Sequence, residues 1–226
     1  MDGGYYDEKL AAGRLRRCYE VASPRVRQYL EAEVEHVRER LRPGDRMLEL
    51  GCGYGRALGP LAYACGLAVG VDTSRDSLLA AREELAGRGN VRFARMDARR
   101  LGFKGGAFDV VACIQNGVSA FHVDPLELMA EALRVTRPGG RVLLSTYVAA
   151  FWDERLAWFE AQAAEGLLGE IDYERTADGV IVCRDGFTAT TYGPEDFRAL
   201  ARRLDVRPEL TDVDGSSLFC EIIKGD

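Results

Sequence analysis

The chain has few of the residues that metal sites and nucleic-acid surfaces need. It contains only two histidines in 226 residues, and no group of His, Asp or Cys has metal-ligand spacing, so we expect no bound metal. Only three of its 30 basic residues are lysines, and the net charge is -6. An acidic total disfavours phosphate binding, and acids interleave with the arginines at 38–42, which indicates a solvated helix face.

Long apolar runs and paired cysteines are also missing. No stretch of 18 apolar residues occurs, which excludes a membrane-spanning helix. The first 17 residues carry several charges, so we expect no secretory signal. The six cysteines form no C-x-x-C pair and several lie in apolar runs, as reduced, buried cysteines of a cytoplasmic protein do.

The chain length and its apolar content favour a single domain spanning residues 1–226. A hydrophobic fraction of 47% is enough for a substantial core. Residues 1–45 are predicted to form helices, because Ser23-Pro24 is a helix start and apolar residues follow at three-to-four spacing. The helix is expected to stop at Pro43-Gly44. From 46 to 147 short apolar strands alternate with helical stretches, including one at 57–65, which predicts a doubly wound, mostly parallel sheet.

The last 80 residues divide into an insertion and a terminal unit. We expect residues 148–192 to cap the active site, with an aromatic helix from Phe151 to Leu168 followed by strands at 173–176, 180–184 and 188–192. Residues 193–226 are predicted to form a helix ending near Leu204 and then a hairpin of strands 206–213 and 217–223.

The most informative segment is the turn Glu49–Arg56, which joins a predicted strand to a predicted helix. It has the pattern E-x-G-x-G-x-G, with glycines at 51, 53 and 55. Glycine accepts positive φ and has no Cβ, so the main chain of such a turn can approach a ligand closely. A dinucleotide fingerprint requires its third glycine at position 56, where this chain has Arg56.

Three further segments follow the turn in order. Asp72 ends the second predicted strand, 21 residues after Gly51, where a carboxylate can bind the two hydroxyls of a ribose. The segments 91–98 and 108–113 have the pattern of a third and a fourth strand. The segment 133–144 adds a helix end, a Pro-Gly-Gly turn and a fifth strand.

In this order the motifs resemble those of the class I S-adenosylmethionine-dependent methyltransferases, which have a Rossmann-like α/β fold. The resemblance is detailed from Arg42 to Tyr147. It implies a seven-stranded sheet closed by an antiparallel C-terminal hairpin, with S-adenosyl-L-methionine as cofactor and S-adenosyl-L-homocysteine as product. The implied cofactor-binding residues are Glu49, Gly51, Cys52, Gly53, Asp72, Thr73, Asp97, Ala98 and Gln115.

Each implied residue has an expected role. Gly51 and Gly53 offer main chain to the donor, and Glu49 supports the turn and faces the methionyl amine. Asp72 is implied to bind ribose, Asp97 and Ala98 to contact adenine. Cys52 is best explained as a small residue that fits the turn.

The acceptor side is less defined. His122 lies in the loop after the fourth predicted strand and is our candidate general base, although it could instead cap the helix beginning at Asp124-Pro125. Tyr192 is the next candidate. His36 is expected at the surface, and Asn116 is a candidate for hydrogen bonding to substrate.

We therefore predict methyl transfer to an oxygen or nitrogen of a small molecule, with no nucleic-acid or membrane partner and with a homodimer left open. The N-P-P-[FYW] signature is missing, which disfavours nucleobase or glutamine methylation. The alternatives are an RNA or protein methyltransferase, a nicotinamide-dependent oxidoreductase, and a non-catalytic nucleoside-binding module.

Overall fold

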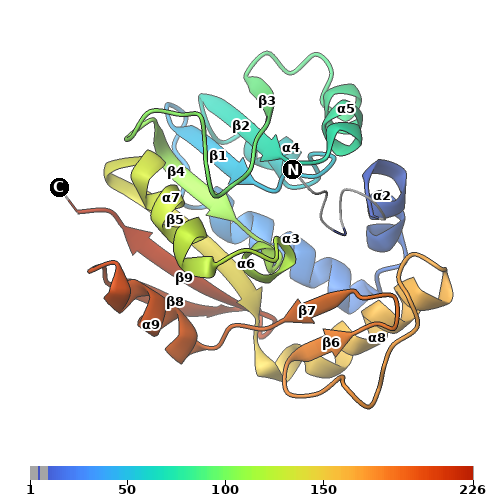
Figure 1. Cartoon of the computed structure of the whole chain (residues 1–226). Helices are drawn as coiled ribbons and strands as arrows, with labels where there is room; N and C mark the ends of the chain where they lie inside the picture. Colours follow the sequence, from blue (N-terminus) through green and yellow to red (C-terminus); the bar gives the residue numbers. More distant parts are fainter. Residues whose placement is uncertain (1–4, 6–9, 226) are drawn as a thin grey trace.

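The protein is described here from a computed structural model that covers Tyr5 and residues 10–225. In these ranges a seven-stranded sheet has the order β3-β2-β1-β4-β5-β9-β8 (Figure 1). The strands are β1 Arg46–Leu50, β2 Leu67–Asp72, β3 Val91–Arg95, β4 Phe108–Cys113, β5 Thr136–Tyr147, β8 Pro208–Val213 and β9 Ser217–Ile223. β1 to β5 are parallel, and β9 pairs antiparallel with both β5 and β8. This arrangement confirms the predicted fold class.

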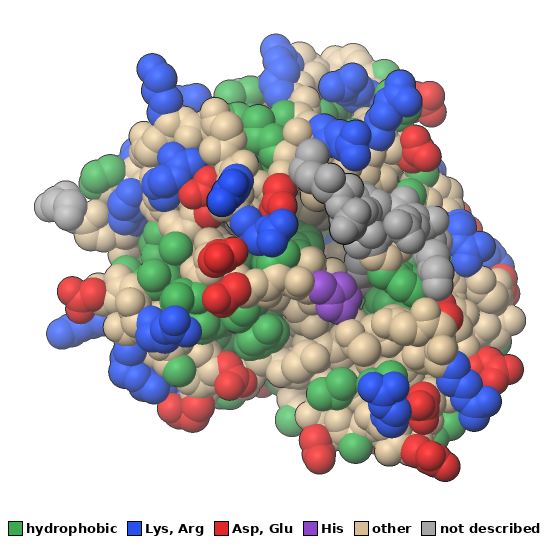
Figure 2. Space-filling model, viewed as in Figure 1, with side chains coloured by type: hydrophobic (Ala, Val, Ile, Leu, Met, Phe, Trp, Pro, Cys, Tyr) green, Lys and Arg blue, Asp and Glu red, His purple; other side chains and the backbone are tan. Residues whose placement is uncertain are grey.

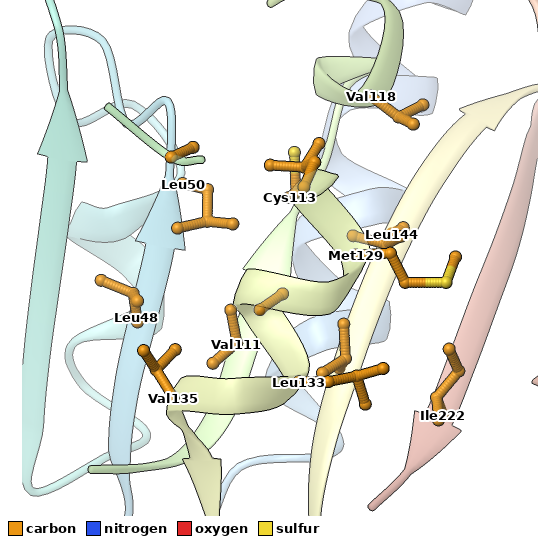
Figure 3. Close-up of a cluster of buried hydrophobic side chains, with 14 of the residues drawn as sticks. Leu48, Leu50, Val111, Cys113, Val118, Met129, Leu133, Val135, Leu144 and Ile222 are labelled. Atoms are coloured by element: carbon orange, nitrogen blue, oxygen red, sulfur yellow. The ribbon is translucent and has the colours of Figure 1, made fainter. Parts of the chain in front are cut away.

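Helices cover both faces of the sheet. Leu133 and Met129 of α7 pack over β1, β4 and β5 (Figure 3). Phe197 of α9 belongs to the same cluster. The opposite face is covered by Val37 of α3 and Leu58 of α4. The helices of the described ranges are α2 Ala12–Glu20, α3 Pro24–Arg38, α4 Leu58–Leu61, α5 Arg75–Glu84, α6 Gly117–Ala120, α7 Pro125–Val135, η1 Ala149–Phe151, α8 Trp152–Ala164 and α9 Pro194–Arg203. None of them is long and apolar enough to cross a membrane.

Two helices differ from the prediction in length. α3 begins as expected, because Ser23 Oγ accepts a hydrogen bond from Val26 N at 3.2 Å. It ends at Arg38, before Pro43-Gly44, and the chain then continues as a turn. The helix predicted over 57–65 is only the four-residue α4, which contains a glycine and a proline. Both residues disfavour helix propagation, which explains the shorter element.

The Pro-Gly-Gly segment does not form a separate turn before the fifth strand. β5 begins at Thr136 and includes all three residues as an irregularity, because Phe108 pairs with Thr136 and Val110 pairs with Arg141. Gly139 has a φ of +70°, and a Cβ on Gly140 would lie 2.7 Å from Asp109 O. The prediction was wrong about the boundary because the glycines let the strand bulge without ending it.

The insertion forms α8 and a small separate sheet of β6 Val180–Val182 and β7 Thr188–Thr190. α8 ends at Ala164 instead of 168, and the strand predicted over 173–176 is not formed. The fully buried Arg155 of α8 holds the β6–β7 hairpin against this helix. Its guanidinium donates hydrogen bonds to Gly179 O at 2.9 Å and to Ala189 O at 2.8 Å. The guanidinium also lies 4.5 Å from the ring centroid of Tyr147.

Candidate functional site

A cavity of about 410 Å³ opens at the carboxyl ends of β1, β2 and β4. Ligands of doubly wound sheets bind at this edge. Eight of the predicted site residues line the cavity: Gly51, Gly53, Asp72, Thr73, Asp97, Ala98, Gln115 and His122. Glu49, Cys52 and Tyr192 are not among the lining residues.

The glycine turn forms one wall of the cavity through its main chain. Gly51 and Gly53 have φ values of +71° and +52°, so both occupy the left-handed region that favours glycine. A Cβ on Gly51 would lie 2.4 Å from Phe121 Cζ, and one on Gly53 would lie 2.9 Å from a methyl of Leu15. The turn therefore has no room for side chains at either position.

Asp72 joins this turn to the second strand. One carboxylate oxygen accepts a hydrogen bond from Gly53 N at 2.8 Å, and the other accepts one from Ser74 N at 2.8 Å. These bonds orient the Asp72 carboxylate at the cavity wall.

Arginines flank the far end of the cavity. Arg99 donates to both oxygens of Asp97, which lowers the pKa of that carboxyl. Arg95 Nε donates to Thr73 O at 2.7 Å. The surface in Figure 2 carries basic (blue) and acidic (red) side chains together around its centre, so this face is not a basic track.

Buried polar atoms without partners gather near the glycine turn. Glu49 is 4% exposed and its Oε2 has no hydrogen-bond partner among the described residues. Burial raises the pKa of Glu49 to about 8, although the nearby Arg56 charge lowers it. Arg56 Nε and Nη2 and Gln115 Nε2 also lack described partners. Such atoms are costly to bury, so they fit a ligand with ammonium and carboxylate groups.

A second group of lining residues is apolar and forms the apolar wall. It consists of Leu10, Leu15, Ile114, Ala120, Phe121 and Val123. Arg56 lies 5.0 Å from the centroid of the Tyr19 ring, and Tyr19 donates its hydroxyl proton to Gln115 Oε1 at 2.8 Å. Tyr19 therefore contacts both Arg56 and Gln115 at the cavity wall.

His122 also lines the cavity, between Phe121 and Val123 in the chain. It has a φ of +51°, and partial burial lowers the pKa of its imidazole below the usual value. The capping role is performed by Asp124 instead, whose carboxylate accepts a hydrogen bond from Leu126 N at 2.8 Å. This finding removes the structural alternative that the sequence left open for His122.

Other predicted residues lie elsewhere. Cys52 is buried against β2, because a Cβ on Gly70 would lie 2.7 Å from its sulfur. Tyr192 packs against Phe197. Asn116 is fully engaged within the protein, since its amide donates to Thr190 O and its oxygen accepts from Thr146 Oγ1.

His36 is buried, contrary to the surface position expected for it, and its ring centroid lies 4.1 Å from that of Phe219. Sequence reasoning missed Leu10 and Leu15 of the apolar wall, because isolated leucines near a chain start carry no signal. It also missed Glu33. The sequence feature that could have identified this residue is that a single acidic residue lies on the apolar face of α3.

The fold and the site together define a Rossmann-like nucleoside-binding protein whose glycine turn departs from the dinucleotide pattern. In the described part of the chain, no group of three or more His, Cys, Asp or Glu side chains could hold a metal ion. The antiparallel β9 lies between β5 and β8, as the predicted seventh strand requires.

Comparisons with known proteins agree with this class. Residues 47–140 match the methyltransferase domain family. The chain is 32% identical over 137 residues to a ubiquinone biosynthesis O-methyltransferase of Methylococcus capsulatus, covering 59% of this chain and 54% of the relative. It is 36% identical over 104 residues to a demethylmenaquinone methyltransferase of Clavibacter sepedonicus, covering 46% and 42%. The chain spans about half the length of these curated relatives.

A solved structure extends the likeness to nearly the whole chain. The PH0226 protein of Pyrococcus horikoshii OT3 superposes with a TM-score of 0.64 at 26% identity, over 90% of this chain and 93% of that one. Residues 47–140 thus match a methyltransferase domain, and the chain has the Rossmann-like fold of the class I S-adenosylmethionine-dependent methyltransferases. The cofactor of this family is S-adenosylmethionine.

Proposed function

We propose that the protein transfers a methyl group from S-adenosylmethionine to an oxygen or nitrogen of a small, largely apolar molecule. The observation that carries the proposal is the division of one cavity into a polar wall at the strand ends and an apolar wall beside it. A cavity of about 410 Å³ matches a small-molecule site in size.

The polar wall is assigned to the donor. Gly51 and Gly53 allow main chain to lie against it, and Asp72 faces the ribose. Ala98 and Asp97 flank the adenine. The unpaired atoms of Glu49, Arg56 and Gln115 match the ammonium and carboxylate of the methionyl end.

The apolar wall is assigned to the acceptor. When bound, S-adenosylmethionine supplies a methyl group already activated by its sulfonium, so this chain mainly aligns the nucleophile and excludes water. The donor would supply this methyl group to an oxygen or nitrogen nucleophile, and the carbon–sulfur bond would break to leave S-adenosylhomocysteine. His122 takes the proton of the nucleophile, because its lowered pKa keeps the imidazole neutral near pH 7.

The names of the relatives support a small acceptor, since the two described above methylate quinone precursors by name. The acidic net charge of -6 is consistent with an acceptor that is not a nucleic acid. Which small molecule is methylated follows from the shape of the apolar wall and is a question for a screen.

Isothermal titration calorimetry tests the donor assignment first. We expect S-adenosylhomocysteine to bind at one site per chain and NADH to show no binding. Tight NADH binding without S-adenosylhomocysteine binding would overturn the proposal. A screen of quinols, phenols and amines, with release of S-adenosylhomocysteine as the readout, then tests the acceptor class.

A further inference from the structure

Glu33 occupies a position that sequence patterning reserves for an apolar side chain. It lies on the stripe of α3 that also includes Val26, Leu30 and Val37, all of which are buried. Its relative exposure is 0%. A carboxylic acid at such a position is costly unless its oxygens are hydrogen-bonded, so its partners indicate why it is there.

Those partners lie on three different strands or strand ends. One oxygen of Glu33 accepts a hydrogen bond from Gln115 N at 2.9 Å, and the other accepts one from Ser217 Oγ at 2.9 Å. Gln115 N is shared with Ser145 Oγ, also at 2.9 Å. Glu33 thus connects α3, which lies on the sheet face opposite α7 (Figure 1), to the end of β4, to β5 and to β9.

The segment held in this way is strained. Gln115 and Asn116 have φ values of +57° and +58°, so two successive residues with side chains are left-handed. That conformation is unfavourable for such residues and persists only where surrounding groups enforce it. Asn116 is held through its own side chain by Thr146 and Thr190, whereas Gln115 is held through its amide by Glu33 and Ser145.

The consequence for the cavity concerns the side chain of Gln115. With its amide directed toward Glu33, Gln115 reaches the cavity wall, accepts a hydrogen bond from Tyr19 and leaves Nε2 without a partner among the described residues. The backbone conformation of Gln115 sets the direction of both its amide and its side chain. Without the hydrogen bond to Glu33, neither direction would be fixed.

We propose that Glu33 is a positioning residue, which holds the left-handed turn after β4 so that Gln115 and Tyr19 present a fixed polar surface to the donor. The proposal rests on the proposed function, since the donor is taken to be S-adenosylmethionine. Glu33 acts through hydrogen-bond acceptance and does not touch the donor itself.

The test uses three substitutions that separate hydrogen-bond geometry from charge and from packing. In Glu33→Gln the amide oxygen can still accept from Gln115 N, and the Ser217 hydroxyl can rotate to accept from the amide nitrogen. Glu33→Asp keeps the carboxyl group but withdraws it by one methylene group. Glu33→Leu removes both acceptors. The matched control is His36→Leu, one turn along α3, which alters a buried polar residue that packs on Phe219 and has no recorded bond to Gln115.

Affinity for S-adenosylhomocysteine, measured by calorimetry well below each melting temperature, is the primary readout. We expect Glu33→Asp and Glu33→Leu to weaken binding by about tenfold or more, since small misplacements of site residues have effects of at least this size. Glu33→Gln and His36→Leu should bind within about twofold of the unmodified protein. If Glu33→Leu does not fold, the contrast between Asp and Gln decides the question.

Amide NMR gives a readout independent of catalysis. In ¹⁵N-labelled protein the Gln115 amide proton should shift in Glu33→Asp and Glu33→Leu, and stay in place in His36→Leu. Equal donor affinity in all the Glu33 variants would overturn the inference, as would a loss confined to Glu33→Gln. Failure of the unmodified protein to bind S-adenosylhomocysteine would instead overturn the proposed function.

Discussion

The two walls of the cavity are built in different ways. The donor wall consists of main chain and of side chains at the strand ends. Hydrogen bonds such as the one from Gly53 N to Asp72 fix their positions. The acceptor wall is made of side chains from α2 and from the segment after β4, held by packing. Hydrogen bonds fix positions to a fraction of an ångström, whereas apolar packing accepts substitutions of similar volume. The donor wall is therefore constrained by the fold, and the acceptor wall is where specificity can vary.

The largest expected effect is that of a substitution at His122, which should affect turnover without affecting donor binding. We expect His122→Asn to lower kcat by about 10²–10⁴ while leaving the Kd of S-adenosylhomocysteine unchanged, because proton removal affects the transition state and not donor binding. Steady-state kinetics and calorimetry measure the two effects. A decrease in kcat of less than about tenfold would mean that alignment of the nucleophile with the methyl group accounts for the rate, without a general base.

The pH profile sharpens this test. A base must be neutral, and burial lowers the pKa of His122, so the residue stays competent to a lower pH than a solvated histidine. Activity should therefore be constant above about pH 6.5 and fall at more acidic pH. In His122→Asn this fall in activity at acidic pH should disappear. If the variant showed the same fall, a group other than His122 would cause it.

The next largest effect is expected at Gly51 in the donor wall. Gly51→Ala places a Cβ in the left-handed region and close to Phe121. We expect the Kd of S-adenosylhomocysteine to rise by about tenfold to a hundredfold, the equivalent of roughly 1–3 kcal/mol of backbone strain. Gly44→Ala is the control, because no atom lies within 4 Å of a Cβ there and its φ is not positive. If Gly51→Ala and Gly44→Ala bound S-adenosylhomocysteine with equal affinity, the main chain at Gly51 would not be important for donor binding.

Asp72→Ala tests the same wall through a side chain. It should weaken donor binding by roughly 1–3 kcal/mol, since a charge-assisted hydrogen bond and the support of Gly53 are lost. Acceptor KM at saturating donor should stay within about twofold. The exposed Asp76 on α5 provides the control Asp76→Ala. If acceptor KM rose as much as donor Kd, the division into two walls would be wrong.

The smallest effect is expected at the junction of α2 with the insertion. Arg14 donates to Gly166 O at 2.7 Å and to Leu167 O at 3.1 Å, so it joins the helix that bears Leu15 and Tyr19 to the segment after α8. Arg14→Ala should raise acceptor KM by about two- to fivefold, the size of one partly exposed bond, with donor Kd unchanged. Hydrogen exchange should show α2 and residues 151–192 gaining protection on S-adenosylhomocysteine binding. Uniform protection in both states would argue against movement of this region.

Local sequence patterns predicted that Gly51, Gly53 and Asp72 lie together, and all three line the cavity. The spacing sufficed because parallel strands place their carboxyl ends at one edge of the sheet. Glu49 and Cys52, which the same patterns included, are buried beside the turn and are not among the residues that line the cavity.

The sequence by itself determined the α/β class, the order of the core elements and the position of the glycine turn, since each depends on residues close together in the chain. Only the tertiary structure decided how Glu33 meets Gln115, 82 residues away, and how Leu15 comes to face Gly53. These contacts depend on how helices pack across the sheet, and no local pattern specifies that packing.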